Sequence, residues 1–359
     1  MTNPFTGRQA QALRVSDAVT LADLGWTPRL SSTESSATGQ PARVTGVTRD
    51  RVDGLTPAGP VTLALPGHVS TGDIAVGDWV MFDPEAGRVV TLLERATLLQ
   101  RRAAGPRAAR QLIAANVDTL GIVTSCNDDF NEARLERYLA LASAAGCLPL
   151  VIITKPDQSD VPDSYRHRAE ALSPLVTALV LNAKDPDEIP RLHPWCRDGQ
   201  TMALLGSSGV GKTTLSNALT GRRDPTQGIR QDDAKGRHTT TARALWRTRP
   251  GGWLVDTPGM RELQLTDAGD GIDAVFEDLA ELATQCRFSD CQHDGEPGCA
   301  IQAAIDAGDL DPARLERWRK LQREDARNSE TLAQIRAKDR SLNKLYRDGK
   351  ARGRHKRGR

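Results

Sequence analysis

The sequence predicts a multidomain α/β protein: a small N-terminal β-barrel, a central domain on a mostly parallel sheet, and a C-terminal helical part that holds a metal ion. Three observations lead to this prediction. Short β-rich runs separated by turn residues follow one another from Ala42 to Gln100, a spacing typical of sandwiches and barrels. Apolar runs then alternate with helix-like runs from Asn116 to Val255, which indicates βαβ units. Finally, three cysteines and one histidine crowd into the segment 286–299. The 359 residues also exceed the size of one ordinary domain.

The barrel is predicted from β-rich runs with Gly, Pro and Asp turns between them, at residues 42–47, 61–65, 77–82 and 89–93. A fifth strand would suit an OB-fold, a five-stranded barrel that often binds RNA. Aromatic residues make up only 4% of the chain, so few side chains could stack on bases. An RNA-binding barrel and an inert spacer therefore both stay open. The basic run from Arg101 to Arg110 is either a solvated hinge or part of an RNA-binding face.

A phosphate-binding loop follows the apolar strand 202–205 and precedes the helix-favouring run 215–219. It fits the pattern G-x-x-x-x-G-K-[ST] in the strand–loop–helix setting that this motif requires. Its glycines let backbone N–H groups turn toward phosphate oxygens, and the following helix N-terminus adds partial positive charge. Lys212 is expected to reach the β- and γ-phosphates, and the Thr213 hydroxyl to bind Mg²⁺. The residues expected to contact the nucleotide here are Gly206, Ser207, Ser208, Gly209, Val210, Gly211, Lys212, Thr213 and Thr214.

Two motifs after this loop are typical of nucleotide-dependent switches. Asp256 ends an apolar strand, where a carboxylate can hold Mg²⁺ through water, and Gly259 can offer its N–H to the γ-phosphate. Thr240 lies in a polar loop before the strand 244–246. We expect Thr240 to complete the Mg²⁺ shell and to move when the γ-phosphate leaves.

Two base-recognition loops come before the phosphate loop. Thr154-Lys155-Pro156-Asp157 fits [NT]-K-x-D, in which the carboxylate accepts hydrogen bonds from guanine N1–H and N2–H₂, a donor pair that adenine lacks. Asn182-Ala183-Lys184 corresponds to the second base-contacting loop, which reads S-A-K in most such proteins. Each follows an apolar strand, and ligands of α/β domains bind at such strand ends. Guanine recognition by these two loops is therefore predicted.

The order of the motifs, with base loops first and the phosphate loop and switches after them, is a rotation of the usual order. Cutting and rejoining a fold at surface loops keeps its three-dimensional site. The sequence therefore predicts a circularly permuted P-loop GTPase domain.

The segment 286–299 holds three thiols and one imidazole, a ligand set that suits tetrahedral Zn²⁺. Four protein ligands leave no open position, so the zinc is expected to be structural. In a reducing compartment such a cluster binds metal more often than it forms disulfides. The predicted ligands are Cys286, Cys291, His293 and Cys299.

The charge of the chain is unevenly distributed. Residues 336–359 contain 11 Lys and Arg residues against 2 Asp and Glu residues, whereas the net charge of the whole chain is only +2. Such a tail either binds RNA phosphates without sequence preference or keeps the protein soluble. The sequence contains no run of 18 apolar residues and no apolar signal-peptide core, so we expect a cytoplasmic protein without a membrane span.

Together these features resemble the RsgA family, the circularly permuted, small-ribosomal-subunit-dependent GTPases of bacteria. The resemblance covers roughly residues 42–330 and rests on the permuted motif order, the metal knuckle, and the segments Gly77-Asp78-Trp79-Val80, Ala115-Asn116-Val117-Asp118 and His238-Thr239-Thr240-Thr241. It implies an OB-fold, a permuted GTPase domain and a zinc-binding C-terminal domain that act in late 30S maturation. The chain departs from the family at Thr154, where Asn is usual, and at Asn182, where Ser is usual. Because Thr keeps a side-chain oxygen, we expect guanine selectivity with some loss of affinity.

The group that positions the attacking water is not a glutamine. In Ras-like enzymes a Gln after the D-x-x-G motif has this role, but Met260 occupies that position here. The resemblance implies an apolar residue at this place and slow intrinsic hydrolysis. His238 is the nearest candidate for a catalytic residue, and the alternative is a solvated loop histidine.

We therefore expect a monomeric GTP hydrolase, stimulated by the small ribosomal subunit, that binds the 30S subunit and its rRNA and leaves after hydrolysing GTP to GDP and phosphate. Its expected cofactors are Mg²⁺ and one structural Zn²⁺. The alternative is an RNA-binding 30S assembly chaperone that uses GTP only as a ligand sensor. A P-loop kinase of small molecules is disfavoured by the guanine motif and the basic tail. The expected segments are an N-terminal extension and linker (1–40), an OB-fold barrel (41–105), the permuted GTPase domain (106–268), a zinc-binding helical domain (269–335) and a basic tail (336–359).

Overall fold

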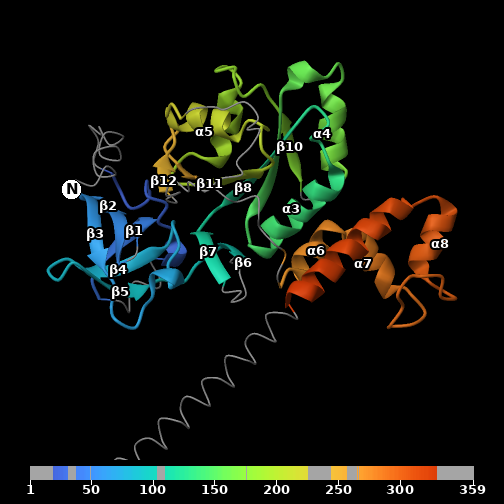
Figure 1. Ribbon diagram of the computed structural model, residues 1–359, viewed down its shortest axis with the longest axis horizontal. Helices are drawn as coiled ribbons and strands as arrows, with labels where there is room; N and C mark the ends of the chain where they lie inside the picture. The colour runs from blue at the N-terminus through green and yellow to red at the C-terminus, as the bar shows by residue number, and fades with distance from the viewer. Residues whose placement is uncertain are drawn as a thin grey trace, which may run out of the picture.

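The computed structural model describes residues 19–30, 38–48, 50–102, 110–174, 176–224, 244–256, 265 and 267–329. Figure 1 shows three parts: a barrel in blue, an α/β domain in green and yellow, and a helical region in orange and red. The α/β domain lies between the other two. These parts confirm the predicted fold class, and the predicted basic tail lies outside the described residues.

The barrel closes with the strand order β1-β2-β3-β5-β4. Its strands are β1 (Gln40–Val47), β2 (Arg51–Thr56), β3 (Gly59–Ala64), β4 (Trp79–Asp83) and β5 (Arg88–Leu92). β3 and β5 pair in parallel, while the other neighbours are antiparallel. A five-stranded Greek-key barrel of this kind is an OB-fold. The sequence alone does not reveal β2, because Asp53 and Gly54 interrupt its apolar pattern. Pairing with β1 and β3 on its two sides makes this segment a strand.

The central domain is built on a six-stranded sheet with the order β10-β9-β8-β11-β13-β12. Its strands are β8 (Thr119–Ser125), β9 (Leu148–Thr154), β10 (Thr177–Val180), β11 (Thr201–Gly206), β12 (Ala244–Arg247) and β13 (Trp253–Asp256). All neighbours are parallel except β12, which pairs antiparallel with β13. The hairpin of β6 (Leu98–Arg102) and β7 (Arg110–Ala115) leads from the barrel into this sheet.

Helices cover both faces of the sheet, so its central strands are buried on both sides. Ile122 and Leu205 belong to the same apolar cluster as α3 (Glu132–Ala144), whereas their neighbours Val123 and Leu204 pack with α5 (Lys212–Thr220). All seven residues of β8 are buried. This double coverage explains why the parallel strands read as continuous apolar runs rather than as alternating patterns.

The helical region consists of α6 (Gly269–Val275), α7 (Glu277–Thr284), α8 (Ala300–Ala307) and the C-terminal helix, residues 312–329. It packs on α3, which connects β8 to β9. Gly271 of α6 lies so close to α3 that a Cβ atom there would stand 2.5 Å from the Ala140 carbonyl oxygen. The carboxylate of Glu136 on α3 is fully buried and accepts hydrogen bonds from Arg314 at 3.2 Å and Arg317 at 2.7 Å. A helical region anchored in this way is fixed to the central domain.

Residues 19–30 fill the junction between barrel and sheet, a role that the sequence analysis did not find. Leu24 is fully buried, and its carbonyl oxygen accepts a hydrogen bond from the Arg43 guanidinium at 2.5 Å. The Trp253 indole donates to the Asp23 carbonyl oxygen at 2.9 Å. Trp26 packs edge-on against Trp79 of β4, with ring centroids 4.8 Å apart. This short segment therefore ties the barrel to the sheet. No helix among the described residues is both long and apolar enough to cross a membrane.

Candidate nucleotide site and metal centre

The predicted base and phosphate loops meet at one edge of the sheet. Because β8, β9, β10, β11 and β13 run parallel, their carboxyl ends lie together, which is where α/β domains bind ligands. Ser125 pairs with Thr154, and Val123 pairs with Gly206. The rotated order of the motifs therefore still assembles a single site, as the permutation predicts.

The phosphate loop leaves β11 at a position that only glycine fits. Gly206 has a φ of 152°, and a Cβ atom there would stand 2.2 Å from the Val123 carbonyl oxygen. The loop then turns into α5, whose N-cap is Gly211 in a left-handed conformation. Val210, which belongs to this loop, is buried, at 1% exposure.

Lys212, the first residue of α5, lies across the phosphate loop. Its Nζ donates to the Gly206 carbonyl oxygen at 2.8 Å and to the Ser207 carbonyl oxygen. Phosphate oxygens would compete for the same ammonium group. Around this lysine, Ser208, Gly209 and Thr213 are exposed, and Ser207 and Thr214 are half-buried.

Thr154 connects the first base loop to the phosphate loop. Its side chain is buried, and its hydroxyl lies 2.7 Å from the Val210 carbonyl oxygen and 3.1 Å from that of Thr124. The sequence predicts that this oxygen supports guanine recognition. In the structure this oxygen contacts backbone carbonyl oxygens of the phosphate loop and of strand β8.

The acidic residue of the base motif is exposed at the site edge. Lys155 adopts a left-handed conformation, with φ 57°, and opens the 3₁₀ helix η2 (Pro156–Gln158), which presents Asp157. In the second base loop, the Asn182 side chain accepts a hydrogen bond from the Lys184 N–H at 3.1 Å. Ala183 is buried beside it, at 8% exposure.

Several predicted switch residues lie outside the described residues: His238, Thr239, Thr240, Thr241, Gly259 and Met260. Their predicted roles stay predictions. Asp256 ends β13 and pairs with Ala244 of β12. This backbone position lies at the same sheet edge as the phosphate loop.

Two further residues beside the site were missed from the sequence. Asn127 follows β8, Gln158 ends η2, and their side chains are joined by a hydrogen bond of 2.6 Å. Their position just after buried parallel strands is the signal that could have identified them.

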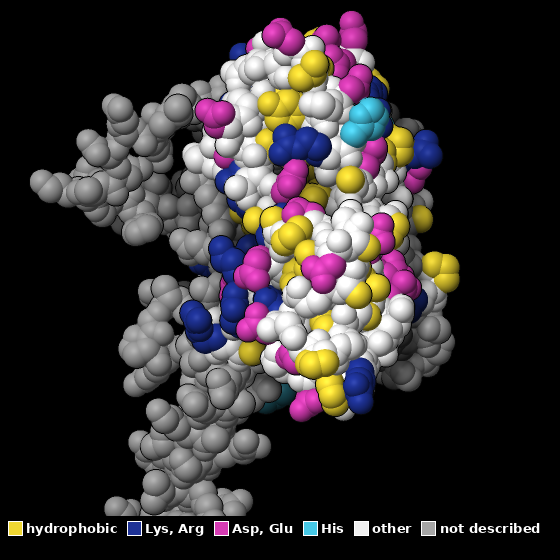
Figure 2. Space-filling model, turned by 90° about the vertical axis from the view of Figure 1, so that its right-hand side faces the viewer, with side chains coloured by type: hydrophobic (Ala, Val, Ile, Leu, Met, Phe, Trp, Pro, Cys, Tyr) yellow, Lys and Arg dark blue, Asp and Glu magenta, His cyan; other side chains and the backbone are white. Residues whose placement is uncertain are grey.

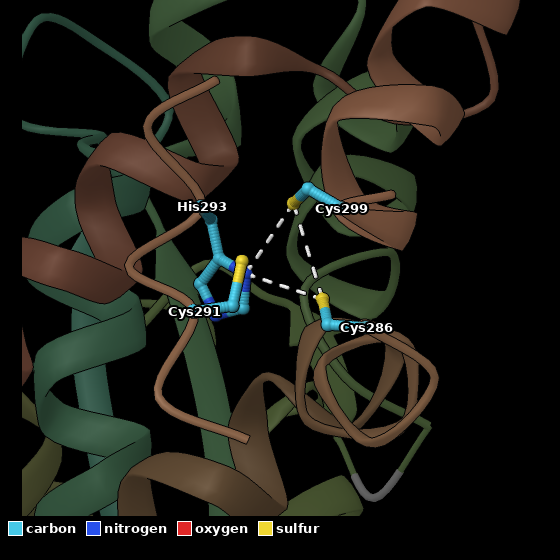
Figure 3. A group of neighbouring side chains, drawn as sticks. All are labelled: Cys286, Cys291, His293 and Cys299. Carbon is cyan, nitrogen blue, oxygen red and sulfur yellow. Dashed lines mark hydrogen bonds between the residues drawn. The ribbon is translucent and has the colours of Figure 1, made fainter. Parts of the chain in front are cut away.

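The four predicted metal ligands point toward one another in the helical region (Figure 3). Their ligand atoms all lie within 4.8 Å of one another. Cys286 Sγ and Cys299 Sγ are 3.9 Å apart, and each lies 3.5 Å from His293 Nδ1. A tetrahedral ion with Zn–S bonds of about 2.3 Å and Zn–N bonds of about 2.0 Å requires S···S separations of about 3.8 Å and S···N separations of about 3.5 Å. The cluster therefore fits Zn²⁺.

The surroundings shift two of the ligands toward their metal-binding protonation states and oppose a third, because burial raises the pKa of Cys291 to about 12. Burial and then the charge of Arg319 lower the pKa of His293, so its imidazole stays neutral. Burial raises the pKa of Cys286, but backbone N–H groups of Ala300 and Ile301 and the neighbouring thiols outweigh it, so the net shift is downward. A thiolate is the form that binds metal.

Glu296 fixes the loop that carries two of the ligands, and the sequence analysis did not single it out. Its carboxylate accepts hydrogen bonds from the N–H groups of Gln292 at 2.8 Å and Asp294 at 2.6 Å. The Gln302 side chain donates to the His293 carbonyl oxygen at 2.7 Å. These outer contacts orient the ligands, as partners around metal sites generally do.

The sheet order, the phosphate loop and the base loops placed before it define a circularly permuted P-loop GTPase. Residues 92–266 match the sequence model of the RsgA GTPase family. The small ribosomal subunit biogenesis GTPase RsgA of Mesorhizobium japonicum is 52% identical over 315 residues, covering 86% of this chain and 91% of the relative. The chain belongs to the RsgA family.

A further relative and two solved structures are also similar to this chain. Small ribosomal subunit biogenesis GTPase RsgA 2 of Vibrio vulnificus is 45% identical over 336 residues, covering 92% of this chain and 95% of its own. The crystal structure of YjeQ from Thermotoga maritima superposes with a TM-score of 0.60 at 26% identity, covering 79% of this chain and 96% of that one. YloQ, described as a circularly permuted GTPase, has a TM-score of 0.57 at 22% identity, over 79% of this chain and 93% of its own, and supports the fold.

Proposed function

We propose that this GTP hydrolase acts in biogenesis of the small ribosomal subunit: it binds the 30S subunit with GTP and leaves after hydrolysis to GDP and phosphate. The names of the two relatives above support this role. One observation carries the nucleotide part of the proposal. The hydrogen bond of 2.7 Å between Thr154 and Val210 joins the guanine motif to the phosphate loop in one site.

In the proposed site, Asp157 accepts two hydrogen bonds from guanine, and the phosphate loop surrounds the phosphates. Lys212 leaves the carbonyl oxygens of its own loop and donates to phosphate oxygens. Thr213 and Asp256 would hold Mg²⁺, which supplies positive charge next to the β- and γ-phosphates. Thr240 and Gly259 respond to the γ-phosphate, and His238 orients the attacking water.

The proposed 30S contacts involve the barrel, the helical region and the basic tail. On the C-terminal helix, the exposed residues Lys320, Arg323 and Arg327 recur at spacings of three and four, so they share one face. Figure 2 shows this end of the molecule, where Lys and Arg side chains gather along one side. Such a face suits RNA phosphates, whose binding to cations weakens with salt. Because Glu136 fixes the helical region to α3, a contact made here is rigidly connected to the GTPase domain.

The test is hydrolysis of GTP and ATP by the full chain, with and without purified 30S subunits. We expect a preference for GTP and acceleration of at least tenfold by 30S subunits. Binding of GTP with no acceleration would favour the chaperone that uses GTP as a ligand sensor. Equal use of GTP and ATP would contradict the guanine site itself.

A further inference from the structure

The loop that follows β8, residues 126–130, carries an asparagine whose side-chain orientation is fixed. The Ser125 hydroxyl donates to Asn127 Oδ1 at 2.8 Å, and the Asp129 N–H donates to the same oxygen at 3.0 Å. An amide oxygen accepts and its nitrogen donates, so Nδ2 faces the other way. It donates to Gln158 Oε1 at 2.6 Å. Asn127 therefore connects the end of β8 to the 3₁₀ helix η2.

The loop that holds Asn127 is anchored at both ends. Ser125 is fully buried and pairs with Thr154 across the sheet. At the other end, Phe130 packs edge-on against Tyr165 of α4 (Pro162–Glu170), with ring centroids 5.1 Å apart. Asn131 then caps α3 by accepting a hydrogen bond from the Arg134 N–H at 2.9 Å. These contacts give Asn127 a fixed position.

The helix η2 has much weaker support of its own. Its backbone hydrogen bonds are internal, from Gln158 N–H to the Lys155 carbonyl oxygen at 3.0 Å and from Ser159 N–H to that of Pro156 at 3.2 Å. Asp157 and Gln158 are both exposed. Among the described residues, the side-chain hydrogen bond from Asn127 to Gln158 is the one that ties η2 to another part of the fold.

We propose that Asn127 is a positioning residue for guanine recognition: through Gln158 it holds η2 so that the Asp157 carboxylate meets guanine N1–H and N2–H₂ together. The inference rests on the proposed function, because it requires guanine as the bound base. Two parallel hydrogen bonds to one carboxylate demand a narrow range of orientations, as bidentate contacts do. A single hydrogen bond tolerates more rotation of η2. Loss of Asn127 therefore weakens the two-bond contact more than a one-bond contact.

Hypoxanthine provides the comparison, because it keeps N1–H but lacks the 2-amino group. The experiment measures equilibrium affinities of the full chain for GDP, inosine diphosphate and ADP by calorimetry. The variants are Asn127→Ala, Gln158→Ala and the double variant. Asp128→Ala is the matched control, since Asp128 is an exposed residue of the same loop. Thermal unfolding of each variant confirms that it is folded.

We expect Asn127→Ala to lower GDP affinity about tenfold and the GDP-to-inosine-diphosphate affinity ratio about fivefold, the range for a lost hydrogen bond. The double variant should bind no more weakly than either single variant, because both act through one contact. Asp128→Ala should leave the ratio unchanged. A parallel loss for GDP and inosine diphosphate, or additive effects in the double variant, would overturn the inference.

The wild-type measurements distinguish this inference from the proposed function. If the wild-type chain binds GDP and ADP equally well, the guanine site fails and this inference fails with it. If the wild-type chain prefers GDP and Asn127→Ala keeps the same base ratios, the guanine site stands and the role of Asn127 is disproved.

Discussion

The hydroxyl of Thr154 donates a hydrogen bond to the carbonyl oxygen of Val210 over 2.7 Å, although 56 positions separate the two residues in the chain. Thr154 begins the base motif, and Val210 lies inside the phosphate loop. The bond is buried, so its loss leaves a buried carbonyl oxygen with one partner fewer. This contact makes the geometry of the base loop depend on that of the phosphate loop.

Replacing Thr154 by valine tests this link, because valine has nearly the same shape and no hydroxyl. An unmet hydrogen bond of this kind costs about 1–3 kcal/mol, so we expect affinity for GDP and GTP to fall about tenfold or more. Calorimetric titration measures it. Thr154→Ser keeps the hydroxyl and should bind nearly as the wild type does. Equal affinities of Thr154→Val and wild type would show that the two loops are not coupled.

Removal of a metal ligand tests the zinc centre. We expect Cys299→Ser to lose the bound zinc and to unfold at a lower temperature, since Cys299 also caps α8 through the Gln302 N–H at 3.4 Å. Metal content by atomic spectroscopy is the measurement, with about one Zn²⁺ per wild-type chain expected. Cys147→Ser is the matched control, because Cys147 is a buried free thiol outside the cluster. A full zinc content in Cys299→Ser would refute the ligand set.

The buried carboxylate of Glu136 should fix the helical region to α3. Glu136→Gln leaves Arg314 and Arg317 without their shared charged partner, and breaking a buried ion pair costs about 3 kcal/mol or more. Denaturant unfolding measures the change. Glu132→Gln on the same helix is the control, since its pair with Arg168 is partly exposed, with side-chain exposures of 52% for Arg168 and 32% for Glu132. We expect a loss below about 1 kcal/mol there.

Arg43 should hold the barrel against the sheet. It is 1% exposed, lies 5.8 Å from the ring centroids of both Trp79 and Trp253, and donates to the Thr201 hydroxyl at 2.5 Å. Burial lowers its pKa to about 10. Lysine cannot reproduce the planar fork of donors, so Arg43→Lys should lower the free energy of unfolding by about 2 kcal/mol.

The control for Arg43 is Arg51→Lys in the same barrel. Arg51 pairs with Asp50 at the surface, with side-chain exposures of 57% and 69%, and such pairs contribute little. We therefore expect no measurable change for Arg51→Lys in the same denaturant titration. A similar loss in both variants would mean that the buried position of Arg43 has no special importance.

The sequence by itself determined the local chemistry of this protein. The glycine-rich loop, the T-K-P-D motif and the four metal ligands lie within short stretches, so their spacing alone identified them. Continuous apolar runs predicted the parallel strands, since strands buried on both faces read in this way. The rotated motif order predicted the permutation, because parallel strands bring their carboxyl ends together whatever their order in the chain.

Tertiary structure decided which side chains reach across the molecule. β2 is a strand because it pairs with β1 on one side and with β3 on the other. Residues 19–30 connect the barrel to the sheet. The Thr154 hydroxyl forms a hydrogen bond with the phosphate loop, and Asn127 forms one with Gln158. Each of these contacts joins residues that are far apart in sequence or lack a local pattern. Which partners meet depends on the burial and the orientation of each side chain, and the packed fold decides both.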